Sequence, residues 1–151
     1  MRFIILLAFF MSSFLYAQEM RDSFNTGDNE IDQYLTDVNV YGKAQYDFFK
    51  RNLAIKFGID IRDVDRYVHK EKFPPADVYY ACALASVSHK NVDDVLALYK
   101  DKNGWGAVAK ELGIKPGSKE FHRLKLKSMS GIGKIKSRNM ENFRGNSKNK
   151  K

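Results

Sequence analysis

The histidines and the single cysteine are the residues of this chain best suited to bind a metal or to act as a nucleophile. The histidines are His69, His89 and His122, and Cys82 is the only cysteine. No two histidines have the i, i+4 spacing of a metal-binding helix, and no cysteine pair accompanies them. Cys82 stands among small and apolar residues, a setting typical of a buried thiol that packs as a small hydrophobe. We therefore expect no metal site, no intramolecular disulfide and no cysteine nucleophile.

Two further groupings are candidates for nucleophilic or acid–base chemistry. Ser118 and His122 can face each other on a helix, but a Ser–His pair also needs an orienting group and an oxyanion site. Asp60, Asp63 and Asp65 stand beside two arginines, and paired carboxylates are a common acid–base set. A solvated helix start explains this cluster more simply, and it lacks the glycine and terminal glutamate of a calcium loop. We predict no catalytic residue and no cofactor, so the chain is not expected to be an enzyme.

Lys115, Ser118 and Lys119 form the local grouping best suited to a ligand. Pro116 and Gly117 mark a turn, and Ser118 can cap the helix that follows. Free backbone N–H groups at a helix N-terminus bind anions, and the two lysines would add positive charge. The three residues are therefore candidate anion-binding residues. The alternative is a capped turn that carries surface lysines.

Apolar residues at helical spacing predict an all-α fold, with one small domain of five or six helices. No convincing two-residue alternation is present, so no sheet is expected. The helix over 76–87 is apolar almost all round, which places it in the middle of the domain. The other helices are expected from Asp28 or Asn29 to near Phe57 with a possible kink at Gly42, from Asp60 to Val68, over 91–99, over 105–112, and from Ser118 onward.

Trp105 is the only tryptophan, and a glycine stands on each side of it. The glycines let the backbone turn tightly around a large ring. Helical spacing places Val108 and Leu112 on the same side as Trp105, while Leu96 and Tyr99 belong to the buried face of the preceding helix. We predict that Trp105 anchors the core between these two helices. The alternative is an exposed aromatic ring that stacks on a ligand.

The run from Gly104 to Lys125 also resembles a known group of proteins. Its segments Gly-Trp-Gly, Ala-Lys-Glu-Leu-Gly-Ile-Lys-Pro-Gly-Ser and Glu-Phe-His-Arg-Leu-Lys are similar to a family of small exported bacterial proteins of unknown function. Residues 75–79 (Pro-Ala-Asp-Val-Tyr) and 92–95 (Val-Asp-Asp-Val), with Tyr99, resemble the same family. The resemblance covers roughly residues 31–125. It implies no activity and no catalytic residues.

Residues 1–17 have the layout of a secretory signal peptide. Arg2 precedes an apolar run that is too short for a comfortable membrane span, and small Ala17 stands before Gln18. We expect cleavage after Ala17 and export to the periplasm or beyond. A retained N-terminal anchor is the alternative. Residues 18–27 are polar and expected to be loose, and residues 28–126 are expected to form the helical domain.

Positive charge is concentrated at the C-terminus. Residues 127–151 hold eight cations and one carboxylate, a net charge of +7, and Arg2 supplies the rest of the +8 of the whole chain. Residues 18–126 are therefore electrically balanced. Apolar residues are sparse after Ser128, so 127–151 is expected to be a disordered basic tail. It could touch an anionic envelope polymer or lipid surface, or serve only as a solubilising tail.

These features favour an exported, monomeric binding or structural module. The runner-up is a helix-turn-helix nucleic-acid-binding protein, because the helix over 105–112 and the next one resemble that motif. The export signal and the neutral domain oppose this reading, so nucleic acid is not the expected partner. An enzyme ranks third.

Overall fold

The computed structural model describes residues 24–102 and 104–131, and these are helical with no strand. The predicted all-α class is therefore confirmed for this part of the chain. The predicted signal peptide and residues 132–151 of the predicted tail lie outside the described residues. The elements are α2 (Asn29–Ala44), α3 (Tyr46–Phe57), α4 (Ile61–Asp65), the π-helical turn η2 (Arg66–Lys70), α5 (Pro75–Ser88), α6 (Val92–Asp101), α7 (Trp105–Glu111) and α8 (Lys119–Met129).

The described residues form seven α-helices rather than five or six, because the long first helix is divided in two. The division falls at Gln45, whose φ of −131° and ψ of 50° lie outside the helical region. Gly42, where a kink was expected, lies inside α2. A Cβ atom at Gly42 would stand 2.5 Å from the Cβ of Pro75. Gly42 is thus a point of close contact between α2 and α5, rather than a hinge.

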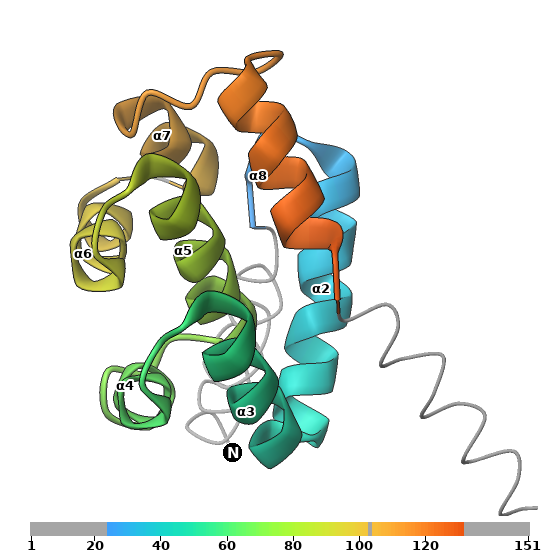
Figure 1. The fold of residues 1–151 in the computed structure, drawn as a ribbon, viewed down its shortest axis with the longest axis vertical. Coiled ribbons are helices and arrows are strands. Elements are labelled where there is room, and N and C mark those ends of the chain that lie inside the picture. The colour runs from blue at the N-terminus through green and yellow to red at the C-terminus, as the bar shows by residue number, and fades with distance from the viewer. Residues whose placement is uncertain (1–23, 103, 132–151) are drawn as a thin grey trace, which may run out of the picture.

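Helix α5 lies in the middle of the bundle, as its apolar sequence predicts. It contacts α2, α3, α6 and α8, and Figure 1 shows it running between them. Nearly all of its side chains are buried, including Tyr79, Tyr80 and Cys82. Burial raises the pKa of the Cys82 thiol to about 12. The thiol is therefore protonated at neutral pH and packs as an apolar group.

The folded unit extends beyond the expected limits of 28–126. Phe24 is 4 % exposed and Thr26 is also buried. The Thr26 hydroxyl donates to Asp32 Oδ1 at 2.7 Å, and the Gly106 N–H donates to the Asn25 carbonyl at 2.9 Å. The expectation of a loose segment is thus wrong for residues 24–27, because Phe24 supplies apolar surface and α7 supplies a backbone donor.

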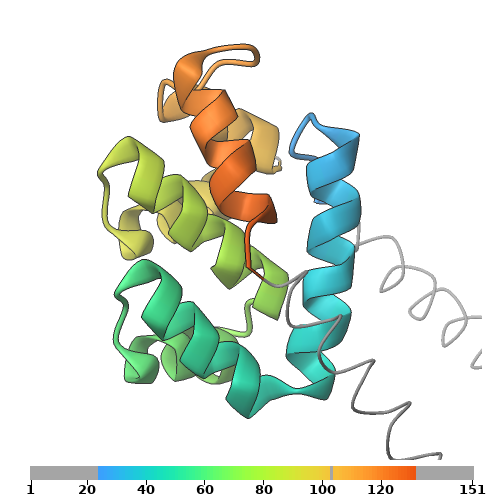
Figure 2. The same cartoon turned by 45° about the vertical axis from the view of Figure 1, so that its right-hand side comes forward.

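At the other end, α8 continues to Met129, three residues past the expected limit, and Ser128 is buried. Helices α2 and α8 lie side by side in the two views of the fold (Figures 1 and 2). Lys125 links them through ion pairs of 2.9 Å to Asp28 and Glu30. No helix among the described residues is long and apolar enough to span a membrane.

Candidate functional site

Trp105 lies in the core and is 0 % exposed. Its ring stacks on Tyr99 of α6, with centroids 4.0 Å apart and planes 7° apart, and forms a T-shaped pair with Tyr80, with centroids 5.4 Å apart. Its Nε1–H donates to Asp77 Oδ1 at 2.8 Å, in a buried position. The other predicted core residues belong to the same core: Val108 and Leu96 are buried, and Tyr99 and Leu112 are partly buried against it.

Asp77 and Tyr80, which come from α5, were not among the residues predicted from the sequence. Asp77 is a carboxylate within a helix that is otherwise almost wholly apolar. A buried carboxylate requires donors, so an acidic residue at this position could have indicated a polar partner such as an indole N–H. The arrangement makes Trp105 a packing anchor that is closed to a ligand.

The glycines beside Trp105 have separate roles. Gly104 precedes α7 with a φ of +102°, a conformation that favours glycine. A Cβ atom at Gly106 would lie 3.1 Å from the Thr26 carbonyl oxygen. Gly106 thereby allows residues 24–27 to cross close to α7. The Gly-Trp-Gly segment is thus explained by the packing of α7.

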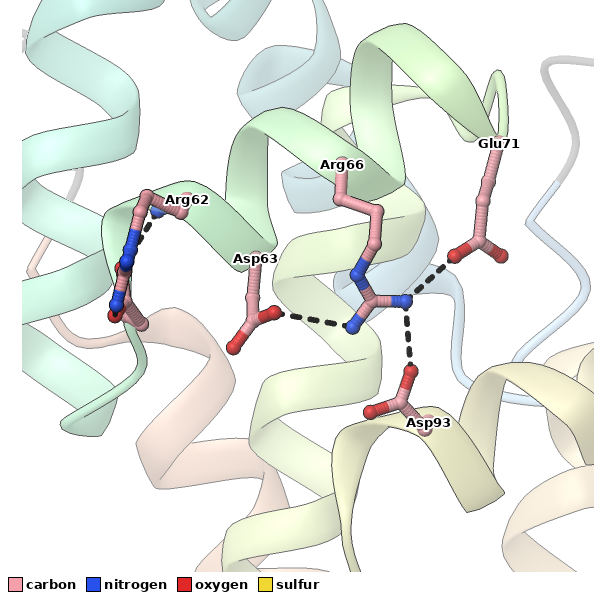
Figure 3. Close-up of polar contacts among 6 residues, drawn as sticks. Arg62, Asp63, Arg66, Glu71 and Asp93 are labelled. Atoms are coloured by element: carbon pink, nitrogen blue, oxygen red, sulfur yellow. Dashed lines mark hydrogen bonds and ion pairs between the residues drawn. The ribbon is translucent and has the colours of Figure 1, made fainter.

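The Asp60–Arg66 cluster is a set of ion pairs that joins helices. Arg66 binds Asp63 at 3.1 Å, Glu71 at 2.7 Å and Asp93 at 3.0 Å, and Figure 3 shows its guanidinium group between the three carboxylates. Since Asp93 lies in the first turn of α6, the cluster fastens α6 to η2. The hydrogen bonds that Arg66 donates to Asp93 and Asp63 raise the pKa of Arg66.

The remaining carboxylates of the cluster are also engaged. Asp60 caps α4 by accepting from the Arg62 N–H, and it also binds the Arg62 side chain. These bonds lower the pKa of Asp60 to about 2. Asp65 accepts from the Tyr46 hydroxyl at 2.8 Å and from Lys50, and these contacts lower its pKa. A general acid needs a raised pKa, so these groups are suited to structure rather than to proton transfer.

A groove of about 470 Å³ lies beside this cluster, between the ends of α3 and α5 and the starts of α4 and α6. Asp60, Asp63, Asp93 and Lys90 are among its lining residues, and Cys82 lies at its wall. These three carboxylates are already paired with Arg62 or Arg66, and the Cys82 thiol is protonated. No group of three or more histidine, cysteine or acidic side chains able to hold a metal occurs in residues 24–102 and 104–131.

Lys115, Ser118 and Lys119 lie together at the start of α8. The Ser118 hydroxyl accepts from the Phe121 N–H at 3.1 Å, the N-cap geometry expected of it. The Ser118 N–H donates to the Lys115 carbonyl at 3.0 Å, and both lysines are exposed. The hydroxyl is bound to backbone rather than to His122, so Ser118 and His122 do not form a nucleophile–base pair. Anion binding at this turn stays a prediction.

The end of α8 is held by Lys56, which was also not among the residues predicted from the sequence. Lys56 Nζ donates to the Lys127 carbonyl at 2.6 Å and to the Ser130 carbonyl. It also donates to the Tyr79 hydroxyl, which in turn donates to the Ser128 carbonyl at 2.6 Å. Burial, assisted by the Lys127 charge, lowers the pKa of Lys56 to about 8. The basic segment (residues 127–151, the predicted tail) therefore begins at a helix end that the fold holds in place.

Comparison of the chain with protein-family models, with curated proteins and with solved structures finds no match.

Proposed function

We propose that this chain is an exported helical module that attaches to an anionic surface of the cell envelope through its basic C-terminal segment. The observation that carries the proposal is the separation of charge along the chain. Residues 127–151 have a net charge of +7, whereas residues 18–126 are balanced. Salt-sensitive contacts of such a protein are expected to come from the charged segment rather than from the neutral domain.

The fixed end of α8 supports this proposal. The contacts of Lys56 and Tyr79 with α8 tie the start of the basic segment to α3 and α5. A cationic segment that begins at a fixed point holds the domain close to whatever surface the segment binds. The predicted signal peptide and the resemblance to exported bacterial proteins support the envelope as the compartment.

Export is tested by fusing a reporter to the C-terminus and comparing the complete chain with one that lacks residues 1–17. We expect the complete chain in the periplasm or medium and the shortened chain in the cytoplasm. N-terminal sequencing of exported material should give Gln18 as its first residue. Exported protein that still begins with Met1 would refute cleavage, and equal distribution of the two fusions would refute the signal.

Attachment is tested by sedimentation with isolated envelope fragments at low and high salt. We expect the exported chain to sediment with the fragments at low salt and to be released at high salt. A chain that ends at Gly131 keeps all the described helices and should remain in the supernatant. Equal sedimentation of the two chains would show that the basic segment is not the attachment site.

The second candidate is nucleic-acid binding, with α7 and α8 as a helix-turn-helix. The exposed Lys119 and Arg123 on α8 favour it. Against it, the connection over 112–118 is longer than the usual turn of about three or four residues, and the net charge of the chain comes mainly from residues 127–151. Retention of duplex DNA by the chain that ends at Gly131 would favour this candidate. An enzyme ranks third, because the described residues contain no arrangement of side chains that supports a catalytic role.

A further inference from the structure

We propose that the outer face of α8 rests on an anionic lipid bilayer, with Leu126 and Met129 placed among the lipid head groups and upper acyl chains. The inference rests on the proposed function, because it identifies the anionic surface as a bilayer and adds an apolar contact to the basic segment. It is carried by the residues that α8 presents to solvent.

The two sides of α8 differ. Its inner side packs against α5 and α2, and Leu124 and Ser128 are buried there. Figures 1 and 2 both place α8 on the outside of the bundle. On the outer side, Leu126 is 72 % exposed and Met129 is 37 % exposed. Leu126 is thus largely uncovered by the bundle, and Met129 is covered in part.

Cations share this outer side. Lys119, Arg123 and Leu126 follow one another at helical spacings of four and three, so they occupy one face. Lys119 and Arg123 are exposed, and neither forms an ion pair within the described ranges. Lys125, at the edge toward α2, is by contrast paired with Asp28. The outward cations are therefore available to an external anion.

The combination of features selects a bilayer over other anionic surfaces. Cell-wall polymers and nucleic acids attract cations but offer no apolar phase for Leu126. An interfacial helix binds by inserting apolar residues while its basic residues meet anionic head groups. Each Lys or Arg near an anionic bilayer strengthens binding about fivefold. In the sequence, residues 127–151, with a net charge of +7, follow the residues of this face.

The test uses a fluorophore at position 126. Leu126→Cys in the exported chain is labelled with the environment-sensitive dye NBD, and Cys82, which is 1 % exposed, stays unlabelled. The control is Phe48→Cys, an exposed position in the first turn of α3. This position is away from α8, because α3 reaches α8 through Lys56 in its last turn. We expect emission from position 126 to shift to the blue with phosphatidylglycerol–phosphatidylcholine vesicles and not with pure phosphatidylcholine, while position 48 stays unchanged.

Binding of the unlabelled variants is measured by vesicle sedimentation, with far-UV circular dichroism to check folding. The double variant Leu126→Ser with Met129→Ser should bind anionic vesicles about tenfold more weakly, because it removes most of the apolar contact. Arg123→Gln should bind about fivefold more weakly. The matched control Phe48→Ser should bind like the unchanged chain.

The outcomes separate this inference from the proposed function. Salt-sensitive vesicle binding with no blue shift at position 126 would overturn the contact of α8 and leave attachment by the basic segment intact. Binding to envelope polymer or DNA, but not to vesicles, would overturn the bilayer as the surface. Absence of salt-sensitive binding to every one of these surfaces would overturn the inference and the proposed function together.

Discussion

Replacement of Trp105 by alanine is the perturbation that most directly tests the packing of this domain. Truncation of a buried tryptophan typically costs about 3–5 kcal/mol. The change also removes the indole N–H from the buried Asp77 carboxylate, and losing a donor to a buried group adds about 1–3 kcal/mol. A small domain is stable by only about 5–15 kcal/mol. We therefore expect Trp105→Ala to be unfolded or close to unfolding at room temperature.

Trp105→Phe separates the two contributions. Phenylalanine retains a ring that can stack on Tyr99, but it has no donor for Asp77. We expect Trp105→Phe to be clearly milder than Trp105→Ala. In a double-mutant cycle with Asp77→Ala, the indole–carboxylate pair should show a coupling of about 1–3 kcal/mol, as expected for hydrogen bonds to charged groups.

The assay is urea unfolding followed by far-UV circular dichroism, which remains available when the tryptophan is absent. Leu126→Ala, at an exposed position, is the control and should lie within about 0.5 kcal/mol of the unchanged chain. Fluorescence of the unchanged chain should be blue-shifted and resistant to iodide. Red-shifted, freely quenched emission together with a stable Trp105→Ala variant would refute the buried anchor and return Trp105 to a binding surface.

Three further changes test other contacts. Gly42→Ala should lower the free energy of unfolding by about 1–3 kcal/mol through its clash with Pro75, whereas an open helical glycine would gain stability from alanine; urea unfolding gives the sign. In thermal unfolding, a chain that ends at Gly131 should keep the midpoint of the complete chain, whereas one that lacks everything from Ser128 onward should melt lower, because Ser128 is buried. An unchanged midpoint in the shorter chain would contradict the packing of α8. Burial lowers the pKa of Lys56 to about 8 in the folded chain. Between pH 8 and 10, the unfolded chain therefore binds more protons at Lys56 than the folded chain does. The contribution of Lys56 to the free energy of unfolding should accordingly rise from pH 8 toward 10. Unfolding of Lys56→Met over the same range provides the reference, and parallel pH curves would show that burial does not depress this pKa.

The sequence by itself determined the helices and most of their ends, because those signals act within a few residues. Asp28 and Ser118 cap α2 and α8 as expected, and Gly58, with a φ of +67°, follows the end of α3. Pro75 occupies the first turn of α5. Apolar spacing likewise placed Trp105 in the core, since burying a large ring depends on which face of a helix is apolar.

Only the tertiary structure decided which elements meet across those faces. The bond from Trp105 to Asp77, the contacts of Arg66 with Asp93 and the hold of Lys56 on the end of α8 all join residues far apart in the chain. Helical periodicity marks a face as apolar or polar but does not name the helix that will cover it. For the same reason, the sequence showed Gly42 only as a weak point in a helix, while the packing of α2 on Pro75 made it a contact where a side chain does not fit.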